Sequence, residues 1–214
     1  ASPATMRDLL LSAFHAGLAA VDARRLLPAH LPAPPAGRTL VAGGGKAAAA
    51  MAAAVEAHWP ADAPLAGRVV TRYGHGLPTA RIAVVEASHP LPDGRGAAAA
   101  EAMLADIATL TEHDLLLVLL SGGGSSLLAL PVAGVTLQDL RRTTKALLAS
   151  GADIAAINTV RRHLTRFSAG QVAAASAAPV LGLMLSDVVG DAVEAIASGP
   201  TAPDPTTFAD ALAI

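Results

Sequence analysis

The chain of 214 residues is 53% hydrophobic and 15% charged, with a formal net charge of −2 at pH 7, so its composition is that of a globular protein with a sizeable core and excludes an intrinsically disordered one. Only 2% of the residues are aromatic, and without a basic excess we expect no nucleic-acid partner. Because no apolar run reaches about 18 residues and cysteine is absent, we expect no membrane-spanning segment, no disulfides and a cytoplasmic location.

A leading helix is the first predicted element. Apolar side chains recur at three- and four-residue spacing over residues 5–27, which is typical of an amphipathic helix. Ser2 and Pro3 are expected to cap it. Residues 28–37 carry four prolines and cannot continue the helix, so they form a linker.

Strands and helices alternate in the rest of the chain. We expect strands at residues 39–42, 67–73, 81–87, 115–120 and 179–186. We expect helices at residues 47–58, 97–110, 136–150, 153–164 and 168–178. Residues 115–120 are an unbroken apolar run, typical of a central parallel strand with both faces covered. The sequence predicts a Rossmann-like three-layer α/β/α fold with a mostly parallel sheet for residues 38–214, preceded by the leading helix and linker of residues 1–37 packed on it.

A glycine-rich loop follows the central strand. It consists of Ser121, Gly122, Gly123, Gly124 and Ser125. Glycines let the backbone bring N–H groups close to a ligand, and ligands of parallel sheets collect beyond the carboxyl ends of the strands. The loop therefore predicts an anion site, with a tight exit from the strand as the alternative.

A second glycine-rich loop follows the first strand. Gly43, Gly44 and Gly45 precede Lys46, and the spacing of Gly43, Gly45 and Ala48 partly matches a dinucleotide-binding fingerprint. No acidic residue ends the next strand to bind a ribose, and the hydroxyl residue of a Walker loop does not follow the lysine. Lys46 near the start of a helix favours a phosphate or carboxylate ligand. A solvated lysine is the alternative.

Polar residues on the helix at 153–164 extend this pattern. Asn158, Arg161 and Arg162 lie within about one turn. An arginine fork suits a carboxylate or phosphate. We expect at most one arginine to face a site and its neighbour to be exposed; a solvated basic helix end is the alternative.

Candidate metal ligands follow the last strand. Asp187 and Asp191 are four residues apart around a glycine, and Mg²⁺ takes one or two such carboxylates. Two ordinary surface acids are the alternative. His75 and His89, each in a turn rich in glycine or proline, are either catalytic groups or surface histidines.

Five segments taken together resemble the glycerate 2-kinase family, whose amino-terminal domain usually precedes a MOFRL domain and some of whose members are labelled hydroxypyruvate reductase. These segments are GGGKAAAAMA, SHPLPD, SGGGSSLLALP, NTVRRHL and LSDVVGDAVEAIASGPTAPD. The resemblance implies phosphorylation of the 2-hydroxyl of D-glycerate by ATP with Mg²⁺. It also implies a second, carboxyl-terminal domain, which we expect to be absent from these 214 residues.

The resemblance also implies roles for the residues that match the family's motifs. Lys46, Arg161 and Asp187 would be catalytic, and Asp187 with Asp191 would hold Mg²⁺. ATP would contact Gly43, Gly44, Gly45, Ser121, Gly122, Gly123, Gly124, Ser125 and Asn158. The base is unassigned, with an aspartate as its candidate.

The chain departs from the family's pattern at Ser168, Ala169 and Gly170, where the family has Lys-Gly-Gly. The alternatives are an NAD(P)H-dependent hydroxypyruvate reductase and a catalytically degenerate anion- or nucleotide-binding module. The expected partners are D-glycerate or a similar hydroxy acid and ATP, with a homodimer as the candidate assembly.

Overall fold

Five parallel strands form one sheet in the order β3-β2-β1-β4-β5 in a computed structural model that describes residues 5–214. They are β1 (Thr39–Gly44), β2 (Leu65–Arg72), β3 (Ile82–Ala87), β4 (Leu115–Ser121) and β5 (Val180–Leu185). All four neighbouring pairs are parallel, which confirms the predicted fold class. Since β1 and β4 each lie between two neighbours, the two glycine loops leave the middle of the sheet.

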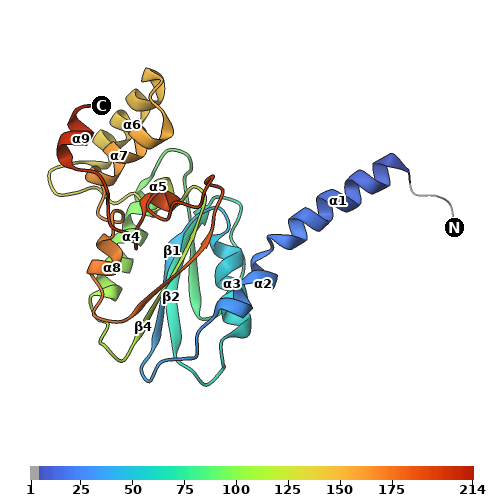
Figure 1. Cartoon of the computed structure of the whole chain (residues 1–214). Coiled ribbons are helices and arrows are strands. Elements are labelled where there is room, and N and C mark those ends of the chain that lie inside the picture. Colours follow the sequence, from blue (N-terminus) through green and yellow to red (C-terminus); the bar gives the residue numbers. More distant parts are fainter. Residues whose placement is uncertain (1–4) are drawn as a thin grey trace.

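Helices cover both faces of the sheet and one of its ends (Figure 1). They are α1 (Met6–Ala20), α2 (Ala23–Leu26), α3 (Ala48–His58), α4 (Gly94–Ile107), α5 (Gly124–Leu127), α6 (Leu137–Ser150), α7 (Ile154–Leu164), α8 (Gln171–Ala174) and α9 (Phe208–Leu212), with the 3-10 helices η1 (Leu27–His30) and η2 (Ile196–Ser198). The helix predicted at residues 168–178 is only one turn long. The helices α6, α7 and α9 gather beside α5 at one end of the sheet.

The apolar run of β4 supplies both cores. Leu117 and Leu119 face the cluster formed with α2 and α3, while Leu116, Val118 and Leu120 face the cluster formed with α4 and α5. Side chains alternate across a strand, so a strand covered on both faces is apolar at every position. On the α3 face, small alanine side chains let the helix pack closely on the sheet.

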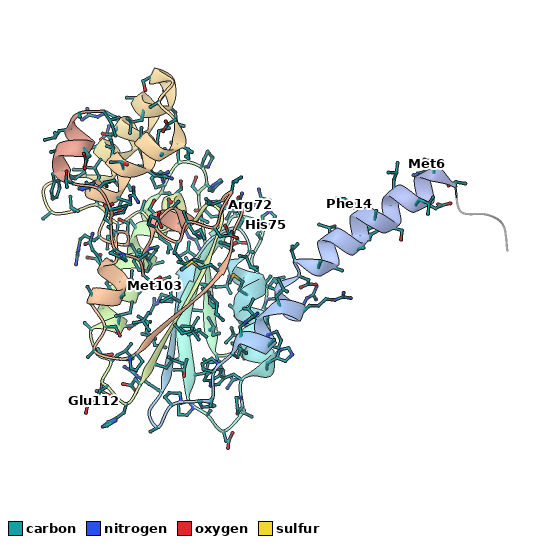
Figure 2. The ribbon with its side chains drawn as sticks, viewed as in Figure 1. Met6, Phe14, Arg72, His75, Met103 and Glu112 are labelled. Carbon is teal, nitrogen blue, oxygen red and sulfur yellow. The ribbon has the colours of Figure 1, made fainter. Side chains whose placement is uncertain are left out.

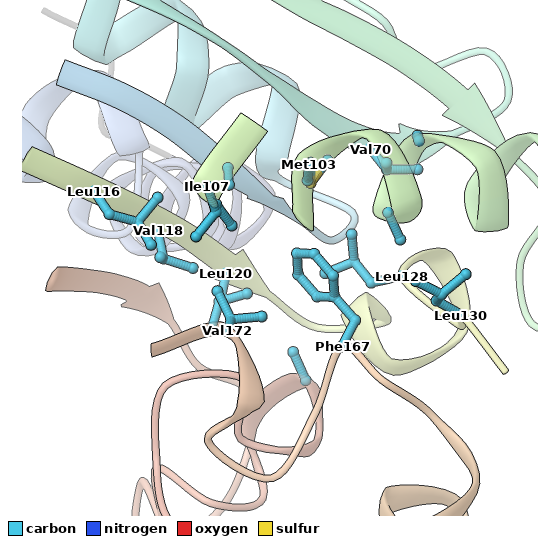
Figure 3. Packing of buried hydrophobic residues seen from close by; sticks show 14 of the residues in the cluster. Val70, Met103, Ile107, Leu116, Val118, Leu120, Leu128, Leu130, Phe167 and Val172 are labelled. Carbon is cyan, nitrogen blue, oxygen red and sulfur yellow. The ribbon is translucent and has the colours of Figure 1, made fainter. Parts of the chain in front are cut away.

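The other face is organised around Phe167, which is 2% exposed. Figure 3 shows its ring in the middle of the cluster, near Leu120, Leu128 and Val172. The ring belongs to the segment after α7, so it attaches that segment to the sheet.

The leading helix differs from its prediction. It ends at Ala20 instead of residue 27, and Thr5 caps it through a reciprocal pair of hydrogen bonds with Asp8; Ser2 and Pro3, the expected caps, lie outside the described residues. No residue of α1 is buried, and the helix extends away from the sheet (Figure 1). The structure does not show the expected packing of this helix on the domain, because its apolar side chains, Leu9, Leu10, Phe14 and Leu18 among them, are more than half exposed. Within residues 5–214, no helix has the length and apolarity needed to cross a membrane.

Candidate active site

The loop after β4 is open to a ligand. Gly123 has φ +87°, in the left-handed region that favours glycine. Within residues 5–214, the backbone N–H groups of Gly122 and Gly123 donate to no protein acceptor. The loop therefore presents two donors that an anion can use.

A cleft of about 710 Å³ opens beside this loop at the carboxyl edge of the sheet. It lies between the loop, α7 and the segment that follows β5. Leu148 of α6, Ile154 of α7 and Val189 give it an apolar wall. The predicted site residues that line it are Gly122, Gly123, Ser125, Asn158, Arg161 and Asp187.

Arg161 is the cation that faces the cleft from α7. Its Nη2 donates to Ser126 Oγ at 3.1 Å, and burial lowers its pKa. No carboxylate lies within 4.0 Å of its guanidinium among the described residues. Ser126 was not among the predicted site residues, although a hydroxyl directly after the glycine loop is a recognisable sign of a site residue.

Arg162 differs from the prediction that the arginine next to the site-facing one is exposed. It was expected to be exposed, but only 7% of it is exposed, and its Nε lies 3.5 Å from Asp204 Oδ1. Asp204 is itself 13% exposed at its side chain. Arg162 therefore fastens the carboxyl-terminal segment to α7 and leaves Arg161 to the cleft.

Lys46 and Asp187 form an ion pair at the cleft. Lys46 Nζ lies 3.6 Å from Asp187 Oδ2, with 44% and 66% of the side chains exposed. The Lys46 N–H donates to Gly122 O at 2.8 Å, which joins the two loops. A β-carbon on Gly122 would lie 2.5 Å from Asp187 Oδ2, so this glycine makes room for the carboxylate.

The first glycine loop packs closely against the neighbouring strands. Gly43 and Gly44 lie within β1, and Gly45 N–H donates to Val70 O at 3.0 Å. With φ +140° at Gly43 and +144° at Gly45, β-carbons there would overlap Leu119 O and Ser121 Oγ. All three glycines are buried. The close approach of neighbouring strands therefore accounts for the three glycines, and we propose this packing role in place of the predicted ATP contacts.

Ser121 and Gly124 are likewise packing positions. Ser121 is 2% exposed, and its Oγ accepts the Ala47 N–H at 3.0 Å. Gly124 is buried, and a β-carbon on it would lie 2.6 Å from Ala197 Cβ. Neither lines the cleft, so we propose packing roles for them as well, in place of the predicted ATP contacts.

Asp191 does not join Asp187 at the cleft. It is exposed, with φ +52°, and it follows Gly190 in a turn. No group of three or more histidine, cysteine or acidic side chains that could hold a metal occurs within residues 5–214. Since Asp191 does not line the cleft, we propose Asp187 alone as the metal ligand.

His89 lines the cleft, whereas His75 is exposed in its turn and does not. Burial lowers the pKa of His89, and the positive charges of Lys46, Arg72 and Arg161 lower it further. Figure 2 shows Arg72 and His75 at the same end of the sheet. The sequence alone did not distinguish the two histidines as candidate catalytic groups. The position of His89, two residues after the parallel strand β3, was the feature that could have favoured it.

Asp93 holds the loop that carries His89. Its Oδ2 accepts the Ser88 N–H at 3.0 Å and the Tyr73 hydroxyl at 2.8 Å, while its Oδ1 caps α4. Burial raises the pKa of Asp93, but these hydrogen bonds outweigh burial and hold it below its usual value. The loop is thus fixed at both ends.

Ser168 occupies the position where the family pattern has a lysine. It is 1% exposed, and its hydroxyl donates to Arg162 O and Thr165 O at 3.0 and 3.1 Å. Ala169, next to it, has φ +54°, a conformation that favours glycine. Since neither residue lines the cleft, this departure leaves the groups described above in place.

The chain is similar to known proteins over most of its length. A protein from Agrobacterium vitis, provisionally named a hydroxypyruvate reductase, is 51% identical over 97% of this chain and 48% of its own length. A Pyrococcus horikoshii protein named glycerate 2-kinase is 46% identical over 82% of this chain and 39% of its own. The crystal structure of a Thermotoga maritima glycerate kinase, 41% identical, covers 90% of this chain with a TM-score of 0.80, over 46% of the kinase chain.

The chain thus spans about half the length of the curated relatives it matches. A family model described as "Domain of unknown function (DUF4147)" matches residues 9–214. Because that match covers nearly the whole chain, this chain belongs to the DUF4147 family, and the predicted resemblance to glycerate 2-kinases is confirmed.

Proposed function

We propose that this chain forms the nucleotide- and glycerate-binding part of an ATP-dependent glycerate 2-kinase. The observation that carries the proposal is Arg161, a half-buried cation that faces the cleft and has no carboxylate partner within residues 5–214. A buried charge without a counterion is unfavourable, so an anionic ligand would complete the site. The free N–H groups of Gly122 and Gly123 line the same cleft and offer that ligand further donors.

Phosphoryl transfer depends on positioning and on neutralising charge. In the proposed site, the N–H groups of Gly122 and Gly123 bind phosphate oxygens. Lys46 and Arg161 offset the charges of the transferred group and of the glycerate carboxylate. Asn158 lines the cleft one turn before Arg161 and is placed to hydrogen-bond a ligand. The apolar wall of the cleft suits the flat ring of a purine base.

Asp187 fits Mg²⁺ as a single carboxylate ligand. Its oxygens are accessible at the cleft, and Mg²⁺ usually keeps several waters and takes one or two protein carboxylates together with substrate phosphates. When bound, the ion supplies positive charge to the phosphate oxygens. Lys46, which pairs with Asp187, orients the carboxylate.

A hydroxypyruvate reductase is the weaker proposal. It is motivated by the name of the Agrobacterium vitis relative and by the partial dinucleotide fingerprint. In that fingerprint the pyrophosphate approaches the glycine loop, but Gly43 and Gly45 are buried between neighbouring strands. The third interpretation, a binding module without catalysis, predicts ligand binding and no turnover.

The test is release of ADP from ATP with D-glycerate and Mg²⁺, with the phosphorylated position read by phosphorus NMR. We expect 2-phosphoglycerate, and a loss of about 10² to 10⁴ in kcat for Lys46→Ala and Asp187→Ala. Lys145→Ala is the matched control, because Lys145 lines a separate groove. Oxidation of NADPH by hydroxypyruvate without ADP release would instead establish the reductase.

The assembly stays a prediction. A homodimer is the proposed state, and sedimentation velocity of the purified chain measures it directly.

A further inference from the structure

We propose that His89 accepts a hydrogen bond from the hydroxyl that is phosphorylated and takes up its proton as the new bond to phosphorus forms. This proposal rests on the proposed kinase function. It assigns the base that the sequence leaves unassigned to an imidazole in place of an aspartate.

The position of the imidazole is the first argument. A β-carbon on Gly123 would lie 2.8 Å from His89 Nε2, so this nitrogen sits against the loop whose N–H groups are free. The structure records no hydrogen bond to either ring nitrogen of His89 among residues 5–214. The hydroxyl of a hydroxy acid that lies next to a phosphate bound at Gly123 therefore finds an unused acceptor beside it.

The rigidity of the loop is the second argument. His89 lies between β3 and α4, and Asp93 holds this loop through Ser88 and Tyr73. A base must lie within hydrogen-bond reach of the proton that it removes. A loop fixed by a capped helix keeps the ring in place better than a free turn such as that of His75.

The charge state is the third argument. Cations face His89 from three elements: Lys46 after β1, Arg72 at the end of β2 and Arg161 of α7. Asp187, the acidic group that lines the same cleft, is paired with Lys46. Burial and the three cations lower the pKa of His89 below its usual value. At neutral pH the ring is then neutral and has a free lone pair.

The choice of base also follows by elimination. The titratable side chains that line the cleft within residues 5–214 are His89, Arg161 and Asp187. Arginine stays protonated, and Asp187 is committed to Lys46 and to Mg²⁺ in the proposed function. His89 remains as the group that can bind a proton near pH 7.

The step balances without any further reactant. The 2-hydroxyl oxygen of the hydroxy acid forms a bond to the γ-phosphorus of ATP, and the bond from that phosphorus to the bridging oxygen breaks. ADP leaves with the electron pair, and the hydroxyl proton passes to His89 Nε2. Water then removes the proton from the imidazolium.

The experiment compares His89→Gln and His89→Ala with the control His75→Gln. We expect His89→Gln to lose about 10² to 10⁴ in kcat while its affinity for Mg-ATP stays within about threefold. The acidic limb of the kcat/KM profile, where His89 becomes protonated, should disappear in this variant. Added imidazole should partly restore His89→Ala, and His75→Gln should match the parent. A His89→Gln variant that keeps kcat within about threefold with the same acidic limb overturns the proposal.

A binding measurement keeps the proposal testable if turnover is slow. Calorimetry with a nonhydrolysable ATP analogue compares D-glycerate with 3-hydroxypropanoate, which lacks the 2-hydroxyl. We expect the parent to prefer D-glycerate by about tenfold and His89→Leu to lose that preference; an unchanged preference overturns the proposal. If the parent binds Mg-ATP but no D-glycerate, the proposed function is wrong, and the proposal for His89, which rests on it, is wrong as well. If glycerate is phosphorylated equally well without His89, the function stands and only this proposal fails.

Discussion

Alanine substitutions in the two glycine loops should affect different properties. Gly45→Ala should lower the stability of the fold, whereas Gly122→Ala should weaken nucleotide binding. Gly45→Ala puts a β-carbon into Ser121 Oγ and a side chain at φ +144°. Backbone strain, overpacking and loss of the Ala47 N–H bond to Ser121 together cost about 3 to 6 kcal/mol of the free energy of unfolding. That is a large share of the roughly 5 to 15 kcal/mol of a typical domain.

Gly122→Ala should leave folding nearly intact. The three atoms nearest to the added β-carbon all belong to the carboxylate group of Asp187, whose side chain is 66% exposed and can rotate away. We expect a loss below about 1 kcal/mol in unfolding and at least about tenfold weaker binding of Mg-ATP. The control is Gly151→Ala, with φ +79° and no atom within 4 Å of the new β-carbon, which should cost about 1 kcal/mol.

Urea unfolding followed by circular dichroism measures the stability of these variants, and calorimetry with Mg-ATP measures binding. If Gly45→Ala is as stable as Gly151→Ala and loses nucleotide affinity instead, the first loop contacts the ligand. The packing role proposed for Gly43, Gly44 and Gly45 would then be wrong.

Two further predictions concern stability. Phe167→Ala should lower the free energy of unfolding by about 3 to 5 kcal/mol, whereas Phe14→Ala, at a residue 60% exposed on α1, should change it by less than about 0.5 kcal/mol; equal losses in urea unfolding would mean that α1 is packed. For Glu56, burial raises the pKa, but N–H bonds from Ala80 and Arg81 outweigh it, so the folded-state pKa is lowered. Its stabilisation is therefore present above the unfolded pKa and lost as pH falls through the folded value. Glu56→Gln should be less stable than the parent by about 1 kcal/mol at pH 7, and this difference should shrink as pH falls through the folded-state pKa of Glu56; a difference that stays constant in acid would contradict this.

The strand pattern predicted the sheet well, because a strand covered on both faces is apolar at every position and β4 shows this plainly. The sequence pattern could not distinguish the roles of the two glycine loops, because both contain three consecutive glycines. The difference is that β1 continues through Gly44, where β2 and β4 flank it, whereas β4 ends at Ser121 and its glycines lie beyond the sheet. Only the strand order, a long-range property, reveals this.

The predictions for the arginine pair and the leading helix were limited in the same way, because both depend on contacts between distant segments. Helical spacing separates Arg161 from Arg162, but the burial of Arg162 depends on Asp204, which lies 42 residues later. The amphipathic pattern of α1 predicts an apolar face without identifying what covers it. Local sequence therefore predicted the elements and the titratable residues of the cleft, His89, Arg161 and Asp187, while the contacts between distant segments decided their roles.

The central claim is that the loop after β4, and not the loop after β1, binds the nucleotide phosphates. Amide chemical shifts recorded by NMR during titration with Mg-ATP test it directly. We predict large shifts for the amides of Gly122 and Gly123 and small ones for Gly43 and Gly45. The reverse pattern, or no shift at Gly122 and Gly123 at saturating nucleotide, would contradict the account.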